Sequence, residues 1–311
     1  ITTVNRGPLV GGHMSSQRAT AFVPGHVTAL FSAHPDDDPA AAGSRGAGVA
    51  LTDGVTVRVS PADDAESVTG DGGTSDAAAT GADAGETTID GEPGSIGAVD
   101  DALAELGVAA DVAVETDLPI GAGFGVSGAA ALGTALAAND AFDRGRSENE
   151  LVRIAHAAEV GRGTGLGDVV AQARGGVPIR LEPGAPGVGE LDGVPATDSV
   201  EYVTFGELST ERVLGGDTET LSAAGEEAVD RHRADPRLPT LMDAARAFAR
   251  EADLLVPEVA EAIAAVESAG GEAAMAMLGR TVFALDTGLS DAGYDPEACR
   301  VDAAGARLVD D

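Results

Sequence analysis

Lysine is absent from this chain of 311 residues, so all 19 of its basic residues are arginines. Tryptophan is absent as well, and Cys299 is the only cysteine. A single cysteine excludes an internal disulfide, and it is typical of a protein from a reducing cytoplasm. No apolar run in the sequence reaches the length that a membrane-spanning helix needs. The chain length predicts about two domains.

Acidic residues dominate the charge, with 52 aspartates and glutamates and a net charge of −33. They are spread along the whole chain, which favours a carboxylate-covered folded protein over one with a single acidic binding face. Self-repulsion on this scale requires counterions, so we expect a cytoplasm rich in salt. Nucleic acids and anionic membranes are repelled by such a surface and are excluded as partners.

Two segments carry no chemistry that the sequence reveals. Residues 1–17 read as an N-terminal tail or a cloning scar, because they contain the run "GGHM" and no apolar signal-peptide core. Residues 61–96 are rich in Asp, Gly, Ser, Thr and Ala with little apolar periodicity. This composition predicts an acidic, mobile loop.

The remaining residues alternate between helical and strand patterns without a strict period, which predicts an α+β fold rather than a doubly wound parallel sheet. A composition shift near 185–200 predicts a nucleotide-binding domain over 18–185 and a C-terminal domain over 186–311. The pair Asp53-Gly54 predicts a hairpin turn, and Ser147 to Glu150 form a capping-box pattern. We further expect strands over 18–22, 108–118, 176–184 and 199–208, a turn near 23–25, helices over 98–106, 128–142, 147–161 and after 217, and a hairpin over 299–311.

A glycine-rich loop joins the strand that ends near Asp117 to the next helix: "DLPIGAGFGVSGAAALG". Glycines let a backbone approach a ligand closely, and a helix N-terminus adds partial positive charge, so this pattern predicts an anion site suited to a triphosphate. The Walker pattern is excluded because its lysine is missing. The dinucleotide fingerprint Gly123-x-Gly125-x-x-Gly128 lacks a well-placed acid after it. From the loop alone, a flexible connection remains an equal alternative.

The loop resembles the nucleotide loop of the GHMP kinases, and "VPGHVTALFSAH" (23–34) resembles their N-terminal element. The third loop of the superfamily matches least, since 270–285 lacks the usual run of glycines. Within the superfamily the chain resembles archaeal pantoate kinases, through blocks that also include "AHAAEVGRGTGLGDVVAQARGG". The resemblance implies a two-domain fold with its active site between the domains, and ATP and Mg²⁺ as cofactors. It implies ATP-binding residues at Pro119, Gly121, Gly123, Gly125, Ser127 and Gly128.

Two acids in the matching blocks are the catalytic candidates. Glu159 lies in the last turn of a helix, where the helix dipole disfavours an acid. From the residues alone chance explains this acid better, but the resemblance implies a Mg²⁺ ligand, together with Ser127. Asp168 follows a glycine turn, and on its own it reads as a helix N-cap. The resemblance implies instead that it orients or deprotonates the attacking hydroxyl.

A pantoate acceptor carries a carboxylate, and arginine is the cation that suits it in this chain. Arg45, flanked by glycines and by Ser44, is the first candidate, with Arg162 and Arg180 as weaker ones and a surface ion pair as the alternative. His26 and His156 are further candidates for substrate contacts, His156 equally for a structural role. A zinc site built from His26, His34 and Asp36 to Asp38 has the wrong spacing.

The resemblance therefore implies an ATP-dependent kinase that phosphorylates the 4-hydroxyl of pantoate to 4-phosphopantoate, for coenzyme A synthesis. Two alternatives stay open: the same chemistry on mevalonate, homoserine or a sugar alcohol, and a nucleotide-binding protein without catalysis. The sequence does not determine the oligomeric state, and a homodimer is left open.

Overall fold

The computed structural model describes residues 18–62, 85–207 and 218–310. The predicted tail over 1–17 lies outside these residues, as does most of the predicted acidic loop. The part of that loop that is described is not wholly irregular, because Thr87–Ile89 and Glu92–Pro93 are short strands of a sheet. The mixture of helices and strands confirms the predicted α+β class.

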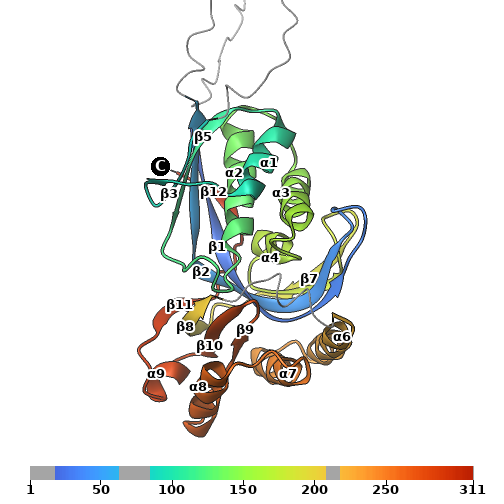
Figure 1. The fold of residues 1–311 in the computed structure, drawn as a ribbon, viewed down its shortest axis with the longest axis vertical. Coiled ribbons are helices and arrows are strands. Elements are labelled where there is room, and N and C mark those ends of the chain that lie inside the picture. The colour runs from blue at the N-terminus through green and yellow to red at the C-terminus, as the bar shows by residue number, and fades with distance from the viewer. Residues whose placement is uncertain (1–17, 63–84, 208–217, 311) are drawn as a thin grey trace, which may run out of the picture.

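The larger sheet runs in the order β12-β1-β2-β5-β3-β4, and β6 and β7 continue from β2 on a second path (Figure 1). Its strands are β1 (Ala19–His34), β2 (Gly43–Pro61), β3 (Thr87–Ile89), β4 (Glu92–Pro93), β5 (Ala110–Thr116), β6 (Val177–Glu182), β7 (Glu190–Val194) and β12 (Arg307–Val309). All described pairs are antiparallel except β3 with β5, which is parallel.

Strands β1 and β2 are long and pair over nearly their whole length, from Ala19 with Val59 to His34 with Gly43. The predicted turn near 23–25 and the predicted hairpin at Asp53-Gly54 are therefore both wrong. The pairing shifts between Pro24 and Gly25, opposite the Asp53-Gly54 pair, which marks an irregularity in two continuous strands. A β-bulge absorbs the extra residues that the dipeptide rule reads as a turn.

Four helices cover one face of this sheet (Figure 1). They are α1 (Gly97–Leu106), α2 (Val126–Ala141), α3 (Glu148–Arg162) and α4 (Asp168–Arg174). Helix α2 contacts β1, β2, α1 and α3, and its small residues make this close packing possible. A Cβ atom at Gly133 would lie 2.6 Å from Cγ2 of Val57. The alanine and glycine content of α2 thus follows from its central place in the core.

The predicted helix ends agree with the structure to within about two residues. Gly107 ends α1 in the left-handed conformation, and Ser147 with Glu150 forms the predicted capping box at the start of α3. Helix α3 continues to Arg162 and closes on left-handed Gly163, slightly later than expected. Helix α2 begins at Val126 rather than at Gly128.

A smaller antiparallel sheet, which lies below the larger one in Figure 1, has the order β11-β8-β10-β9. Its strands are β8 (Ser199–Glu207), β9 (Ala273–Ala276), β10 (Gly279–Leu285) and β11 (Glu297–Arg300), and its helices are α6 (Thr218–Ala234), α7 (Leu238–Glu251), α8 (Pro257–Ser268) and α9 (Gly288–Asp291). Helices α6 and α7 also pack on β1, where Phe248 meets Phe31 edge-on at 5.7 Å between ring centroids.

The predicted hairpin over 299–311 is wrong, because its two strands join different sheets. Strand β11 pairs with β8, whereas β12 pairs with β1. Asp302 holds the connection across the larger sheet, with its backbone bonded to Ala50 and Gly176 and its carboxylate to the amides of Ala304 and Gly305. Strands β7 and β12 belong to the larger sheet although both follow residue 185. The domain boundary near 185–200 remains a prediction from the sequence. Within the described ranges, no helix is both long and apolar enough to cross a membrane.

Candidate active site

The glycine-rich loop between β5 and α2 has the geometry of a phosphate loop. Gly121, Gly123 and Gly125 all have positive φ, at 79°, 93° and 65°. At Gly123 a Cβ atom would lie 2.9 Å from the carbonyl oxygen of Met277, so this position has no room for a side chain. The N-cap residue of α2 is Gly125, which has no side chain to cap the helix. The first amides of this helix are therefore available to an anion.

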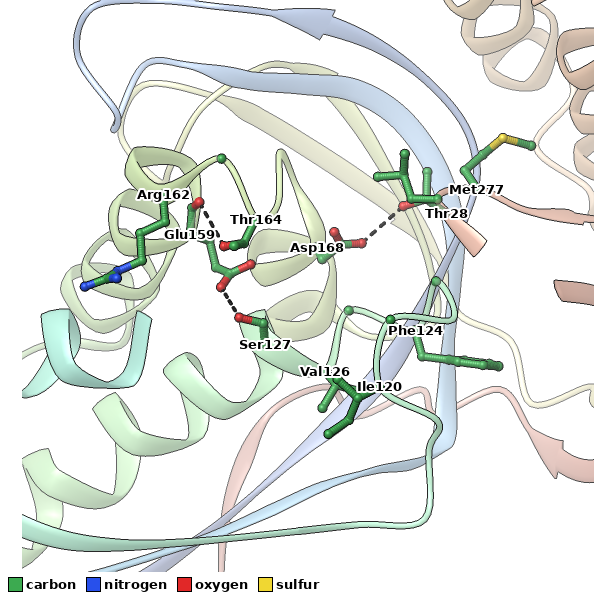
Figure 2. A pocket seen from close by; sticks show the side chains of 15 residues that line it. Thr28, Ile120, Phe124, Val126, Ser127, Glu159, Arg162, Thr164, Asp168 and Met277 are labelled. Atoms are coloured by element: carbon green, nitrogen blue, oxygen red, sulfur yellow. Dashed lines mark hydrogen bonds between the residues drawn. The ribbon is translucent and has the colours of Figure 1, made fainter. Parts of the chain in front are cut away.

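A cavity of about 310 Å³ lies between this loop, the first turn of α2, the end of α3, the start of α4 and the turn before β10 (Figure 2). Ser127, Glu159 and Asp168 all line it, so the structure brings the three predicted catalytic residues together. Thr28, Thr164 and Leu278 line it too, and the sequence did not single them out. Thr28 could have been found, since it stands two residues after His26 on the same face of a strand.

Ser127 and Glu159 form one polar pair on this cavity (Figure 2). The Ser127 hydroxyl donates to Oε1 of Glu159 at 2.6 Å, and the Glu159 residue is only 4% exposed. Burial raises the pKa of the Glu159 carboxyl, although the hydrogen bond from Ser127 opposes this shift. The pair presents hard oxygen atoms, the ligand type that Mg²⁺ prefers. Within the described ranges, no group of three or more His, Cys, Asp or Glu side chains is placed to hold a metal ion.

Asp168 is the first residue of α4, and Gly167 rather than Asp168 occupies the N-cap. Its Oδ1 atom accepts hydrogen bonds from Nδ1 of His26 at 2.8 Å and from the Thr28 hydroxyl at 3.2 Å. Burial acts to raise the pKa of Asp168, but these hydrogen bonds and the nearby Arg180 leave the pKa below its ordinary value. The side chain keeps 20% of its surface exposed. Asp168 is therefore an ionised, oriented carboxylate at the cavity.

His26, predicted as a substrate contact, lies behind Asp168. It is completely buried, and its Nε2 atom has no hydrogen-bond partner among the described residues. A Cβ atom at Gly48 would lie 2.5 Å from this nitrogen, so β2 closes off that side of the ring. Burial lowers the pKa of His26, which keeps the ring neutral at neutral pH with its proton on Nδ1, facing Asp168.

Ser44, His156 and Arg180 form a second group of polar side chains near Asp168. A Cβ atom at Gly167 would lie 2.6 Å from both the Ser44 hydroxyl and Nε of Arg180. Nε2 of His156 donates to the carbonyl oxygen of Ala42 at 2.9 Å, and burial lowers its pKa. Arg180 is 2% exposed, and its Nε and Nη1 atoms have no partner among the described residues. A buried guanidinium with unused donors suits a carboxylate ligand.

Arg45, the first candidate for that role, lies elsewhere. Neighbouring residues of a strand point to opposite faces, so Arg45 points away from the face that carries Ser44. Its Nε atom donates to the carbonyl oxygen of Leu181 at 2.8 Å, and Nη2 lies 3.5 Å from a carboxylate oxygen of Asp230 on α6. The structure thus places Arg180, a weaker candidate, close enough to Asp168 to lower its pKa, although Arg180 lines a separate cavity beside β6 and β7. Arg45 lies on the opposite face.

The other predicted residues divide between the cavity and its surroundings. Gly121, Gly123 and Gly125 line the cavity, whereas Pro119 lines a larger acidic cavity at the junction of the two sheets. Gly128 is buried against α4, where a Cβ atom would lie 3.1 Å from Cγ2 of Val169. Arg162 lines the cavity mouth, but its guanidinium pairs with Asp101 of α1.

The chain is similar to several known proteins over nearly its whole length. Residues 95–176 match the GHMP kinases N terminal domain. The chain is 36% identical to a pantoate kinase of Thermococcus kodakarensis, over 85% of this chain and 86% of that protein. It is 32% identical to a pantoate kinase of Methanospirillum hungatei, over 88% and 89% of the two chains.

Solved structures have the same fold. A phosphotransferase related to the CoA biosynthesis pathway superposes with a TM-score of 0.79 at 28% identity, over 94% of this chain and 98% of that one. The homoserine kinase of Cytophaga hutchinsonii superposes with a TM-score of 0.64 at 17% identity, over 97% and 100%, which shows the fold alone. The chain therefore belongs to the pantoate kinase family, with the GHMP kinase fold, and it is a phosphotransferase that acts on an alcohol group.

Proposed function

We propose that this protein transfers the γ-phosphoryl group of ATP to the 4-hydroxyl of pantoate, which yields ADP and 4-phosphopantoate for coenzyme A synthesis. The observation that carries the proposal is that Ser127, Glu159 and Asp168 meet in one cavity at the N-terminus of α2. The relatives named pantoate kinases support the choice of acceptor.

The triphosphate would lie along the loop, with its oxygens facing the free amides of the first turn of α2. The positive φ values at Gly121, Gly123 and Gly125 support this placement, because they allow the backbone to approach a ligand. This site compensates for the missing lysine with backbone dipoles rather than with side-chain charge. Arg162 is a basic residue that lines the cavity, but its guanidinium forms an ion pair with Asp101.

Ser127 and Glu159 fit a Mg²⁺ ion bound with the nucleotide, since both present oxygen atoms to the cavity. Mg²⁺ keeps several waters and takes few protein ligands, so two such groups beside a triphosphate suffice. When bound, the ion would neutralise charge on the phosphates. Glu159 must be ionised for this role, which its raised pKa makes dependent on pH.

Asp168 would orient the acceptor hydroxyl and take its proton. As the hydroxyl oxygen bonds to the γ-phosphorus, the bond from phosphorus to the bridging oxygen breaks, and that oxygen leaves with ADP. The lowered pKa of Asp168 keeps the carboxylate ionised, so that it can accept a hydrogen bond from the acceptor hydroxyl and orient it. Arg180, with Ser44 beside it, would bind the carboxylate of pantoate close to Asp168.

A panel of acceptors tests the proposal. The purified protein at molar salt with ATP and Mg²⁺ would be offered pantoate, mevalonate and homoserine, with ADP release and the phosphorylated product both measured. We expect turnover with pantoate and little with the others. Turnover of mevalonate or homoserine in place of pantoate would mean that the protein is a kinase with a different acceptor.

Asp168→Asn separates catalysis from mere nucleotide binding. The variant should bind ATP as the wild type does and lose roughly 10²-fold or more in turnover, the usual effect of an acid–base group. Wild-type protein that binds ATP and phosphorylates none of the acceptors would favour the alternative of a nucleotide-binding protein without catalysis.

A further inference from the structure

Gln172 links the phosphate loop to the helix that carries Asp168. It is completely buried on α4, four residues after Asp168, so both side chains project from the same side of that helix. Its Nε2 atom donates a hydrogen bond to the carbonyl oxygen of Gly125 at 2.9 Å. Gly125 is the last residue of the loop before α2.

The contact is direct, with no room for a side chain between loop and helix. A Cβ atom at Gly125 would lie 3.0 Å from Nε2 of Gln172 and 3.1 Å from Cβ of Asp168. In a trans peptide the carbonyl and the next N–H point in opposite directions. A hydrogen bond that holds the Gly125 carbonyl therefore also sets the direction of the Val126 amide, and Val126 lines the cavity.

Gln172 is a poor choice for stability at this position. The carbonyl oxygen of Gly125 accepts two hydrogen bonds, one from the amide of Ala129 in α2 at 3.0 Å and one from Nε2 of Gln172 at 2.9 Å. Because the amide nitrogen of Gln172 faces this carbonyl, its Oε1 atom is left on the other side. This Oε1 atom is buried and has no hydrogen-bond partner among the described residues. A buried acceptor without a partner destabilises the folded state. A methionine would fill similar space without that penalty.

We infer that Gln172 is a positioning residue for phosphoryl transfer, which acts by fixing the Gly125 carbonyl. Through α4 it holds the phosphate loop at a set distance from Asp168, so that the nucleotide and the acceptor hydroxyl meet in line. The inference rests on the proposed binding of ATP at this loop.

The experiment replaces Gln172 by methionine and compares both substrates. Gln172→Met should raise the KM for ATP by about tenfold, the factor typical of one lost hydrogen bond, and should lower kcat as well. The KM for pantoate should stay within about twofold of the wild type, because Ser44 and Arg180 are untouched. The thermal midpoint should stay equal or rise, since the unpaired Oε1 is gone.

Thr134→Val is the matched control. The Thr134 hydroxyl on α2 is also buried without a partner among the described residues, but Thr134 lies nine residues beyond Gly125, about 13 Å along the helix. The control should keep both KM values and kcat. Equal ATP kinetics in Gln172→Met and wild type would overturn the inference, as would a fall in thermal midpoint with both KM values raised together. Wild-type protein that fails to use ATP would instead overturn the proposed function itself.

Discussion

His26 and Asp168 stand 142 positions apart in the chain, and Nδ1 of His26 donates to Oδ1 of Asp168 at 2.8 Å. Because β2 closes the far side of the ring, His26 has no path to a substrate except through the aspartate. The histidine thus orients the carboxylate and favours its ionised form.

Replacing His26 tests this relationship. His26→Phe removes the donor, so the pKa of Asp168 should rise and the acid limb of kcat/KM should move to higher pH, with turnover lowered roughly tenfold or more. His26→Asn can place an amide near the position of Nδ1 and should recover part of the activity. The pH profiles of both variants check this; identical profiles for His26→Phe and wild type would contradict it.

Glu159 should lower the stability of the folded protein at neutral pH, although activity requires it. Its pKa is raised in the folded state, so folding favours the protonated form, and the free energy of unfolding falls as pH rises from the ordinary glutamate value through the raised one. Glu159→Gln should therefore raise the thermal midpoint at neutral pH and flatten its pH dependence, while Mg²⁺-dependent turnover is lost. Thermal melts between pH 4 and 8, about the range in which such a carboxyl titrates, check this. A lower midpoint at neutral pH would count against it.

The two arginines make opposite predictions for the acceptor. Arg180→Met should raise the KM for pantoate by about tenfold to a hundredfold, since a charge-assisted pair with the carboxylate is lost. Arg45→Met, which removes a cation from the opposite face, should leave this KM within about twofold. Steady-state kinetics with saturating ATP separates the two. A larger effect at Arg45 than at Arg180 would instead identify Arg45, the first candidate from the sequence, as the residue that binds the carboxylate of pantoate.

Salt should control stability strongly. With a net charge of −33, carboxylate repulsion destabilises the folded state unless counterions screen it. The thermal midpoint should fall steadily as KCl is lowered from molar to about 0.1 M, where the screening length grows to roughly 10 Å. A midpoint that does not change with salt would remove the inference of a salt-rich cytoplasm.

Local signals predicted much of the fold. Gly107 and the capping box at Ser147 mark helix ends through interactions within a few residues, and the structure confirms both. The errors came where distant strands decide the outcome. Asp53-Gly54 is a good turn sequence, but pairing with β1 keeps β2 continuous through it, with a bulge in place of a turn. The chain after Cys299 crosses to the larger sheet because Asp302 bonds to Ala50 and Gly176.

The same division holds for the active site. The loop glycines and Ser127 could be found from spacing, and resemblance pointed to Glu159 and Asp168. Arg180 could not be ranked above Arg45, because the choice depends on which face of the sheet each side chain occupies. That depends on the register of β2 with β6, which pairs Gly46 with Arg180. The link from Gln172 to Gly125 likewise appears only when α4 packs on the loop.

The most direct measurement is a crystal structure with Mg²⁺, a non-hydrolysable ATP analogue and pantoate. We expect Ser127 Oγ or Glu159 to lie at roughly 2.1 Å from the metal, and a carboxylate oxygen of Asp168 within about 3.2 Å of the acceptor hydroxyl. A nucleotide bound away from the loop that ends at Gly125, or Asp168 far from the terminal phosphoryl group, would contradict the proposed chemistry.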